Sequence, residues 1–396
     1  MIPGDIGAAI AGLLSAGAAA GELPAQAAGL RPAGTWRPAP AHAGGGPGTY
    51  STSLPLALAA LADRPARQVA ALLASRLADL PWISTARVTG GGYLTVTVTT
   101  RHLAGLAARV VAAGEAAAQS DALAGTRLAA PVLPDPGAAT SWAQAWRRHR
   151  DALGGRLARA AGAEVLFFDF QQIRSTASTR QAAAPSVLAA ATETVGSPAA
   201  IAGHGGQVQA AVAYHGADAV RYVLARTSAP SAERIGRQLA LPLDLANPYV
   251  AVRYAHADAA STLRWAASLG LAEGRGTGQE AATAEPDARQ PAQEPAADEL
   301  LPPELALLEV MSWLPERVAA AARRRRPAEL VAYLEHLAGV WLDCNQACPA
   351  LPFRGAAAPA VGARTQAAAR LGLADAARAA LAGGLALLGV SAPDRI

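Results

Sequence analysis

The chain contains no lysine, so all 34 of its fixed positive side chains are arginines, set against 30 aspartates and glutamates. The resulting net charge of +4 is too small to indicate a polyanionic partner by itself. The absence of lysine excludes amine-based stabilisation of a phosphate at any position. Arginine offers a planar and less compact charge in its place.

Cysteine is also scarce, and the two that occur, Cys344 and Cys348, cannot form a disulfide framework for 396 residues. This scarcity fits a reducing cytoplasm. Their spacing of four residues is compatible with a metal pair. The same positions continue an apolar helical stripe, however, and no complementary ligand cluster accompanies them, so core packing is the favoured interpretation and no metal is expected.

Long apolar runs are lacking too, since no stretch of twenty apolar residues is evident that would span a membrane. The apolar segment from Ile6 to Leu23 is preceded by Asp5 rather than by basic residues. It is therefore predicted to be an ordinary helix and not a secretory leader. The sequence predicts a soluble protein with no membrane partner.

The length favours two or three domains. A helix is expected from Ile6 to about Ala20, followed by a Pro/Gly-rich loop over 31–48. Apolar residues at helical spacing after Pro65 predict a second helix, and alternation over 90–100 predicts a strand. These elements indicate a small α+β module that ends near residue 115.

The middle of the chain carries one helix-strand pair. A helix is predicted between Ser141 and Gly162, with Trp142, Trp146 and His149 on its apolar stripe, and a strand from Glu164 to Phe170. Residues 175–211 show no strong period and are predicted to be irregular.

The remainder predicts helices: one from Gly216, one from Tyr249 to Leu269, and three near 303–322, 327–348 and 366–388. Residues 272–298 lack aromatic side chains and are rich in Glu, Gln, Pro and Ala. They cannot bury enough surface to order themselves, so a disordered linker or insertion is predicted there.

One string is specific enough to indicate a family. Residues 247–266 read NPYVAVRYAHADAASTLRWA, which resembles the NPxxYVQYAHAR segment leading into the DALR anticodon-binding domain of arginyl-tRNA synthetases, a class I family. The run 329–351, ELVAYLEHLAGVWLDCNQACPAL, is similar to the long helix of that domain with its Cys-Pro turn. The ending at 370–396, RLGLADAARAALAGGLALLGVSAPDRI, is similar to its terminal helix.

The first hundred residues also resemble this family. GTYSTSLPLALA at Gly48 and GGGYLTV at Gly90 are similar to its N-terminal additional domain. Thr95 stands where the family usually has an asparagine, which puts recognition of the tRNA D-loop by this module in doubt.

The resemblance implies a multi-domain and mainly α fold. It comprises a small α+β N-terminal module at 1–115, a reduced α/β centre at 116–215 that is a remnant of the Rossmann-type catalytic domain, and a DALR-type helical anticodon-binding bundle at 216–396 with the insertion at 272–298.

The two catalytic motifs of the family cannot be recognised in this sequence. Its HxGH sequence binds the transferring phosphate at a helix N-terminus, and here RRHRDALGG at 147–155 retains only His149 as a candidate catalytic residue. The favoured alternative to a catalytic role is that His149 is a buried core residue whose hydrogen bonds are satisfied within the protein. STASTRQ at 175–181 faintly resembles a second catalytic loop of the family. The hundred residues between 116 and 215 are also fewer than the roughly 150 that a full two-half nucleotide fold needs.

The resemblance places tRNA contacts in the helical domain, where aromatic rings, histidine and arginine read unstacked bases and phosphates. The alternatives are helix packing for the aromatic and His cluster and a solvated basic face for the arginines. Arg323 to Arg326 precede Pro327 and are predicted to lie at a corner between helices. The candidate residues are Asn247, Tyr249, Arg253, Tyr254, His256, Arg264, Arg317, Arg323, Arg324, Arg325 and Arg326.

The sequence is compatible with three alternative functions. The first is a tRNA-binding paralogue of arginyl-tRNA synthetase without catalysis, a pseudoenzyme whose partner is an arginine tRNA and which needs no cofactor. The second is an arginine-tRNA ligase with a degenerate site, which would use ATP and Mg²⁺. The third is a protein-interaction module that has lost RNA binding and has an unidentified protein partner.

Overall fold

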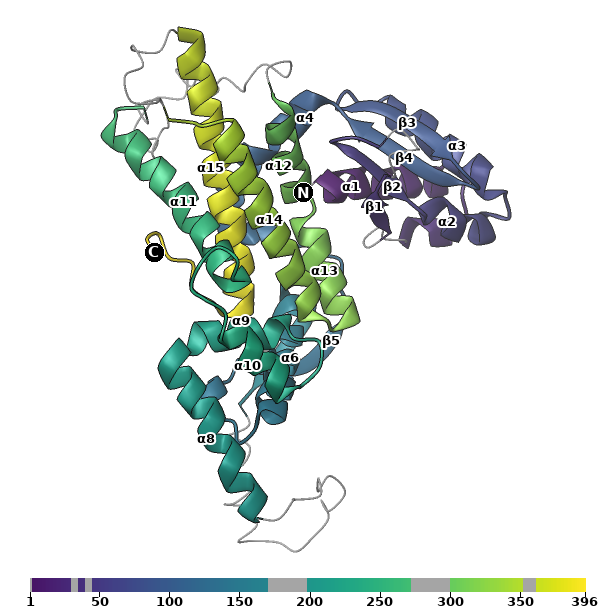
Figure 1. Cartoon of the computed structure of the whole chain (residues 1–396). Coiled ribbons are helices and arrows are strands. Elements are labelled where there is room, and N and C mark those ends of the chain that lie inside the picture. Colours follow the sequence, from purple (N-terminus) through teal and green to yellow (C-terminus); the bar gives the residue numbers. More distant parts are fainter. Residues whose placement is uncertain (1, 30–34, 40–44, 170–197, 272–299, 352–360) are drawn as a thin grey trace, which may run out of the picture.

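The computed structural model describes residues 2–29, 35–39, 45–169, 198–271, 300–351 and 361–396. Figure 1 shows a small module of strands and short helices beside a group of long helices, with a third group of elements below them. Most of the described chain is helical, as the sequence predicted. The fold is the mainly α, multi-part architecture that was expected.

The N-terminal module is built on an antiparallel four-stranded sheet with the order β1-β2-β4-β3. Helices α2 and α3 both contact strand β4. The elements are α1 (Ile2–Ala19), β1 (Trp36–Pro38), β2 (Thr49–Thr52), α2 (Leu54–Ala62), α3 (Ala66–Ala78), β3 (Ile83–Thr89) and β4 (Tyr93–Val98). The helix after Pro65 and the alternating strand are confirmed. The short strand β1 was missed, because three residues between prolines and glycines give no readable period.

The middle of the chain contains one parallel strand pair. Strands β5 (Arg127–Pro131) and β6 (Glu164–Phe168) are joined through α6 (Trp142–Ala160), as parallel strands require. Helix α6 lies so close to the pair that a Cβ at Gly155 would approach the Cβ of Ala130 to 2.2 Å. The short elements α4 (Thr100–Ala104), α5 (Leu106–Ala113), η3 (Gly114–Ala118) and η4 (Pro136–Ala138) complete this region.

Three further helices cover the end of this unit: α8 (Pro198–His215), α9 (Ala217–Arg226) and α10 (Ala232–Leu239). The prediction of irregular structure over 175–211 is wrong for 198–211, which form most of α8. The several glycines there lowered the expected helix content, yet the segment is rich in alanine, the strongest helix former. Residues 175–197 lie outside the described part of the chain.

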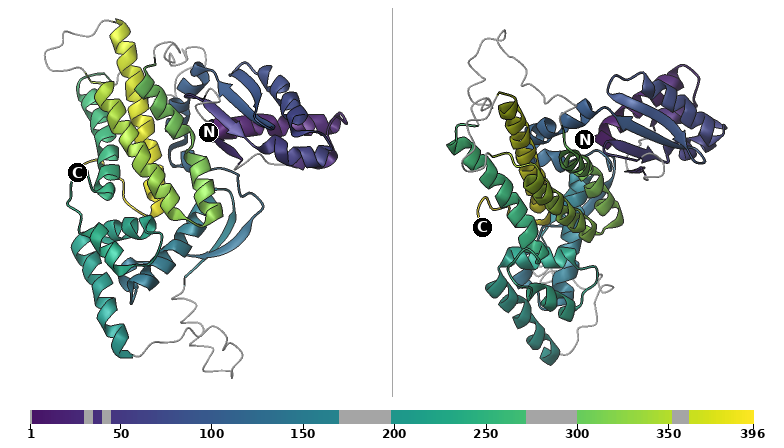
Figure 2. Two further views of the ribbon diagram at one scale, coloured as in Figure 1. Left: turned by 45° about the vertical axis from the view of Figure 1, so that its right-hand side comes forward. Right: turned by 45° about the horizontal axis from the view of Figure 1, so that its top comes forward.

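The helical bundle consists of α11 (Pro248–Ser268), α12 (Pro302–Ser312), α13 (Leu314–Arg324), α14 (Pro327–Ala347) and α15 (Val361–Leu388). The single helix predicted over 303–322 is wrong, since the chain breaks at Trp313 into α12 and α13. Pro315 explains the break, because it lacks an N–H and its ring clashes with the carbonyl four residues earlier. Figure 2 shows α11, α14 and α15 side by side from two further directions.

One hydrophobic core runs from the N-terminal module through α6 into the bundle. Polar contacts fix the junctions. The Tyr50 hydroxyl donates to Ser312 Oγ at 2.9 Å, which ties β2 to α12. The Arg156 guanidinium on α6 donates to the main-chain oxygens of Ala386 and Leu387, at 2.6 and 3.1 Å, near the end of α15. The parts are therefore joined by specific pairs as well as by apolar packing.

Two of the described helices are long and apolar enough to cross a membrane, by length and composition alone: Ile2–Ala19 and, within α15, Thr365–Leu388. Neither is an uninterrupted run of twenty apolar residues, because the first has 18 residues and contains Asp5, and the second contains Arg370, Asp375 and Arg378. In the second helix 67% of the apolar window is buried inside the protein. Along α1 the buried residues Ile2, Ile6, Ile10 and Leu14 join the same core. Core helices commonly show this composition.

Candidate nucleic-acid interface

Helix α11, which carries the NPYVAVRYAHA string, begins with a fixed cap. The side chain of Asn247 accepts a hydrogen bond from Tyr249 N at 3.1 Å, and Pro248 occupies the first helical position. The Asn247 amide also donates to the main-chain oxygen of Pro242 at 3.1 Å. Asn247 is buried. The structure therefore places this candidate contact residue inside the turn that starts the helix.

Tyr249 and Arg253 form a pair one turn apart on α11. The Arg253 guanidinium donates to the Tyr249 hydroxyl at 2.8 Å and lies 5.0 Å from the centre of its ring. The Tyr249 ring packs against Tyr222 of α9, with 5.5 Å between centroids. Burial raises the pKa of Tyr249, and the positive charge of Arg253 opposes that rise. Both residues lie at the junction of α9 and α11.

The last residues of the chain run along α11 and occupy several of its polar side chains. His256 Nδ1 lies 2.9 Å from the main-chain oxygen of Pro393, and Arg264 donates to that of Asp394 at 2.8 Å. Arg253 also contacts Ser391 Oγ at 3.5 Å. Burial lowers the pKa of His256, which favours the neutral ring. Three predicted tRNA contacts thus hold the tail formed by residues 391–396.

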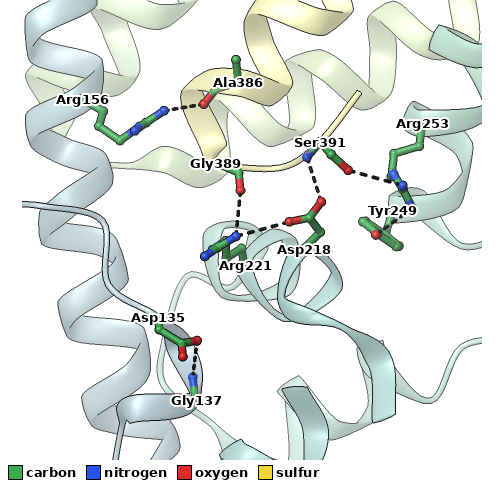
Figure 3. Close-up of polar contacts among 10 residues, drawn as sticks. All are labelled: Asp135, Gly137, Arg156, Asp218, Arg221, Tyr249, Arg253, Ala386, Gly389 and Ser391. Atoms are coloured by element: carbon green, nitrogen blue, oxygen red, sulfur yellow. Dashed lines mark hydrogen bonds and ion pairs between the residues drawn. The ribbon is translucent and has the colours of Figure 1, made fainter. Parts of the chain in front are cut away.

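A second set of contacts holds the same tail from α9, as Figure 3 shows. The Asp218 carboxylate accepts from the main-chain N–H of Ser391 at 2.9 Å and from Arg221 at 3.3 Å. Arg221 also contacts the main-chain oxygen of Gly389 at 3.4 Å. These hydrogen bonds lower the pKa of the Asp218 carboxyl against the opposing effect of burial. The end of α15 is therefore positioned by both α9 and α11.

The outward side of α11 carries two aromatic rings. Tyr254, a predicted contact, is 39% exposed, and Trp265, which the sequence analysis did not select, is 62% exposed. Trp265 lies within the string at 247–266 but after its YAHA part, which carries the family resemblance, so motif matching passed over it. The signal available in the sequence was its spacing of eleven residues from Tyr254, which returns to the same face of a helix after three turns.

The arginine-rich corner lies where it was predicted. Helix α13 ends at Arg324, Arg325 has a left-handed backbone with φ of 51°, and α14 begins at Pro327. Glu329 pairs with Arg324 at 2.9 Å and with Arg326 at 3.9 Å. Within the described residues, Arg323 and Arg325 have no ion-pair partner. Glu329 thus pairs with two of the four exposed arginines at this corner.

Arg317 lies two turns earlier on α13. Its guanidinium is 5.7 Å from the centre of the Trp313 ring, which packs in turn against Tyr50 of the N-terminal module. Arg317 is exposed to solvent. It belongs to the same helix as the arginine corner, and its charge is fixed over a buried ring.

His149, the candidate catalytic histidine, is 1% exposed on the inner side of α6. Burial and the nearby positive charge of Arg221 lower its pKa to about 3. A neutral, enclosed imidazole on an apolar stripe has the properties of a core histidine. The structure gives it no open face toward a substrate.

A shallow hollow of about 200 Å³ lies at the carboxyl ends of β5 and β6. Ligands of parallel sheets bind in this position. Asp135, Arg148 and Asp169 are its charged lining residues, beside Pro131 to Pro134. The Asp135 side chain accepts from Gly137 N at 3.1 Å and so caps the short η4 turn. The described residues in this hollow do not include a histidine pair or a glycine-rich loop.

Thr95 of β4, which stands where the family usually has asparagine, is buried in a group of hydroxyls. Its Oγ1 donates to Ser51 Oγ at 3.4 Å and lies 2.9 Å from Thr89 Oγ1. Cys344 and Cys348 are likewise buried and free, and burial raises the pKa of both thiols. Among the described residues no group of three or more His, Cys, Asp or Glu side chains is placed to hold a metal ion.

Comparison with known protein families and sequences matches the helical bundle to an anticodon-binding domain. Residues 252–396 match the DALR anticodon binding domain family. The chain is 38% identical over 185 residues to an arginine–tRNA ligase of Frankia alni, an alignment that covers 46% of this chain and 29% of that protein. It is 36% identical over 181 residues to the corresponding ligase of Kineococcus radiotolerans, with the same coverage. The matched region thus spans less than a third of these relatives.

The solved arginyl-tRNA synthetase of Thermus thermophilus shares the fold. The TM-score is 0.52 with 15% sequence identity, over 91% of this chain and 96% of that one. This likeness concerns the arrangement of the elements alone.

Proposed function

We propose that this arginyl-tRNA synthetase-like chain of partial length binds tRNA through its helical bundle and does not itself charge it. The bound species in this proposal is an arginine tRNA, held at its anticodon arm, in the cytoplasm. ATP and Mg²⁺ have no part in this activity.

The arginine corner at the end of α13 carries the proposal. It lies inside the segment that matches the DALR anticodon binding domain. Arg323 and Arg325 are exposed, and neither is neutralised by a carboxylate within the described part of the chain. Phosphate contacts by such arginines supply most of the affinity and the salt dependence of nucleic-acid binding. A surface that served only to solubilise the helix would more often alternate its charges.

The residues that hold the tail have a different role in this proposal. Arg253, His256 and Arg264 already make hydrogen bonds to Ser391, Pro393 and Asp394. We infer that they position the tail and the start of α11, and act on tRNA through that arrangement. Direct contact is assigned to Tyr254 and to the arginines of α13.

The absence of catalysis is supported by local features. Position 149 retains a histidine, but it is buried and its pKa is lowered to about 3. No lysine is present to stabilise a transferring phosphate. The described parallel sheet between β5 and β6 has two strands. Incubation of the pure protein with arginine, ATP, Mg²⁺ and arginine tRNA is expected to give no arginyl-tRNA. Arginine-dependent charging would contradict this part of the proposal and establish the ligase alternative.

A protein-interaction role is the second candidate, and one loop favours it. Leu241, Leu243 and Leu245 between α10 and α11 are all exposed, Leu243 by 83%. Asn247 fixes this loop through Pro242, so its leucines are presented on an ordered backbone. Exposed apolar patches commonly mark protein partners. If Leu243→Ser abolishes binding of a cellular protein while the pure chain binds no tRNA, this candidate replaces the first.

A further inference from the structure

The parallel strand pair β5–β6 has two faces that differ in their surroundings. Helix α6 packs on the inner face, where a Cβ at Gly155 would meet the side chains of Ala130, Val165 and Phe167. Side chains alternate between the two faces of a strand, so the intervening residues form the outer face. They are Arg127, Ala129 and Pro131 of β5 and Glu164, Leu166 and Phe168 of β6.

The outer face is open to solvent over most of its length. Leu166 is 74% exposed, and Ala129, its neighbour in register, is exposed as well. In the next row Arg127 Nε donates to Glu164 Oε2 at 2.6 Å, and both side chains are largely exposed. Parallel strands are normally covered on both faces. A large apolar side chain on an open face of this kind indicates a binding surface.

The free edges of the pair do not favour the addition of another strand. At the edge of β6, the Arg159 guanidinium already donates to the main-chain oxygen of Val165 at 3.1 Å. On β5, Val132 N donates to Phe168 O at 3.0 Å. The alternate residue Pro131 therefore turns its backbone to the free edge, where it offers no N–H. A partner is expected on the outer face and not along an edge.

The register of the strands makes the outer face complementary to itself. Arg127 lies opposite Glu164, and Ala129 lies opposite Leu166. If a second copy packs face to face about a twofold axis parallel to the strands, each β5 lies over β6 of the other copy. Arg127 then faces the partner's Glu164, and the small Ala129 faces the partner's Leu166. A twofold interface requires this kind of self-complementarity.

The charge of this face also favours a second copy over a nucleic acid. Arg127 and Glu164 cancel each other, so the face has no excess of positive charge to attract a polyanion. The same two groups become attractive across a twofold axis, because each guanidinium meets a carboxylate of the other copy.

We propose that the outer face of the β5–β6 pair is a homodimer interface, with Leu166 at the centre of the contact. This interface is independent of the proposed tRNA binding by the helical bundle. Five-residue strands span only about 16 Å. The contact is therefore smaller than a standard interface, and a reversible dimer is expected to form at about 10–100 µM.

Sedimentation velocity of the full chain from about 1 to 300 µM tests this interface at the low end of interface sizes. The expected result is a shift from a 39.9 kDa monomer toward a dimer as the concentration rises. Leu166→Asp is expected to weaken the association by about tenfold or more, because it places a carboxylate in the apolar centre. Leu61→Asp, at an exposed leucine of α2, is the matched control and should dimerise like the wild type.

Two charge variants test the twofold arrangement itself. Arg127→Glu makes the face acidic and Glu164→Arg makes it basic, so each variant alone is expected to be monomeric. An equal mixture of the two is expected to associate about as tightly as the wild type. Both positions are exposed, and circular dichroism checks that the variants are folded.

Three results would overturn the proposed interface. The first is a wild type that stays monomeric over the whole concentration range. The second is a dimer that Leu166→Asp leaves unchanged. The third is a mixture of Arg127→Glu and Glu164→Arg that stays monomeric under conditions in which the wild type dimerises. None of these results bears on whether the helical bundle binds tRNA.

Discussion

The Arg264 guanidinium donates a 2.8 Å hydrogen bond to the main-chain oxygen of Asp394, so a side chain expected to meet RNA also holds the end of its own chain. His256 does the same with Pro393 at 2.9 Å. The polar residues of α11 are thereby divided. Those that contact the tail fix the structure, whereas Tyr254 and Trp265 remain exposed.

Arg264→Ala is expected to loosen the tail without unfolding the bundle. Amide hydrogen exchange at Ser391, whose N–H donates to Asp218, should become faster, because one of the contacts that hold residues 391–396 is removed. The free energy of unfolding should fall by less than about 1 kcal/mol, since the Arg264 side chain is exposed. Arg234→Ala, on the exposed side of α10, is the matched control. Unchanged exchange in the tail would contradict the anchoring role.

Two adjacent glycines of α6 test the packing of this helix on the β5–β6 pair. A Cβ at Gly155 would approach the Cβ of Ala130 to 2.2 Å, while a Cβ at Gly154 meets nothing within 4 Å. Gly155→Ala is expected to destabilise the protein by roughly 1–3 kcal/mol through overpacking. Gly154→Ala should stabilise it by about 0.5–1 kcal/mol through helix propensity. Urea unfolding measures both, and effects of the same sign would refute this packing.

His149 is expected to make stability depend on pH. Its pKa in the folded protein is about 3, whereas an unfolded histidine titrates near 6.5. Below that value the unfolded chain binds a proton that the folded chain does not, so stability falls as the pH falls. From pH 7.5 to 5.5 the loss due to this one group is about 1 kcal/mol.

His149→Leu should remove that share of the loss, measured by chemical unfolding at the two pH values. Burial also lowers the pKa values of His102 and His256, so some pH dependence of the same sign should persist. His336→Leu, at an exposed position of α14, is the control and should leave the difference unchanged. An identical pH dependence in wild type and His149→Leu would show that His149 is accessible to protons in the folded state.

The arginine corner is expected to act on RNA and not on stability. Changing Arg323 and Arg325 to Gln should weaken tRNA binding and reduce the slope of log affinity against log salt by up to about one unit for each lost phosphate contact. Their side chains are exposed, so the unfolding free energy should change by less than about 0.5 kcal/mol. Arg234 and Arg237 to Gln on α10 provide a charge-matched control. An unchanged salt slope would remove the corner from the interface.

The fold was largely predictable because its helices and strands carry strong periods. Val69, Leu73 and Leu77 identify α3, and the alternation from Tyr93 to Val98 identifies β4. The two elements that were predicted wrongly, the helix over 303–322 and the irregular segment over 175–211, have local causes. Pro315 divides a continuous apolar pattern into two helices, and the glycines of 203–206 obscured α8.

The candidate interface was less predictable, because a residue type does not reveal its partner. Arg253, His256 and Arg264 look like RNA contacts in the sequence, and only the folded chain shows that residues 391–396 lie against them. Asn247 likewise proved to be a helix cap. The arginine corner was placed correctly, because Pro327 after a run of arginines marks a helix start.

Equilibrium binding to an arginine tRNA at near-physiological salt, beside the same tRNA with its anticodon replaced, tests the central claim most directly. Preferential binding of the unaltered tRNA is the predicted result. An absence of binding, or equal binding of both RNAs that modest salt abolishes, would contradict an anticodon-arm interface in the helical bundle.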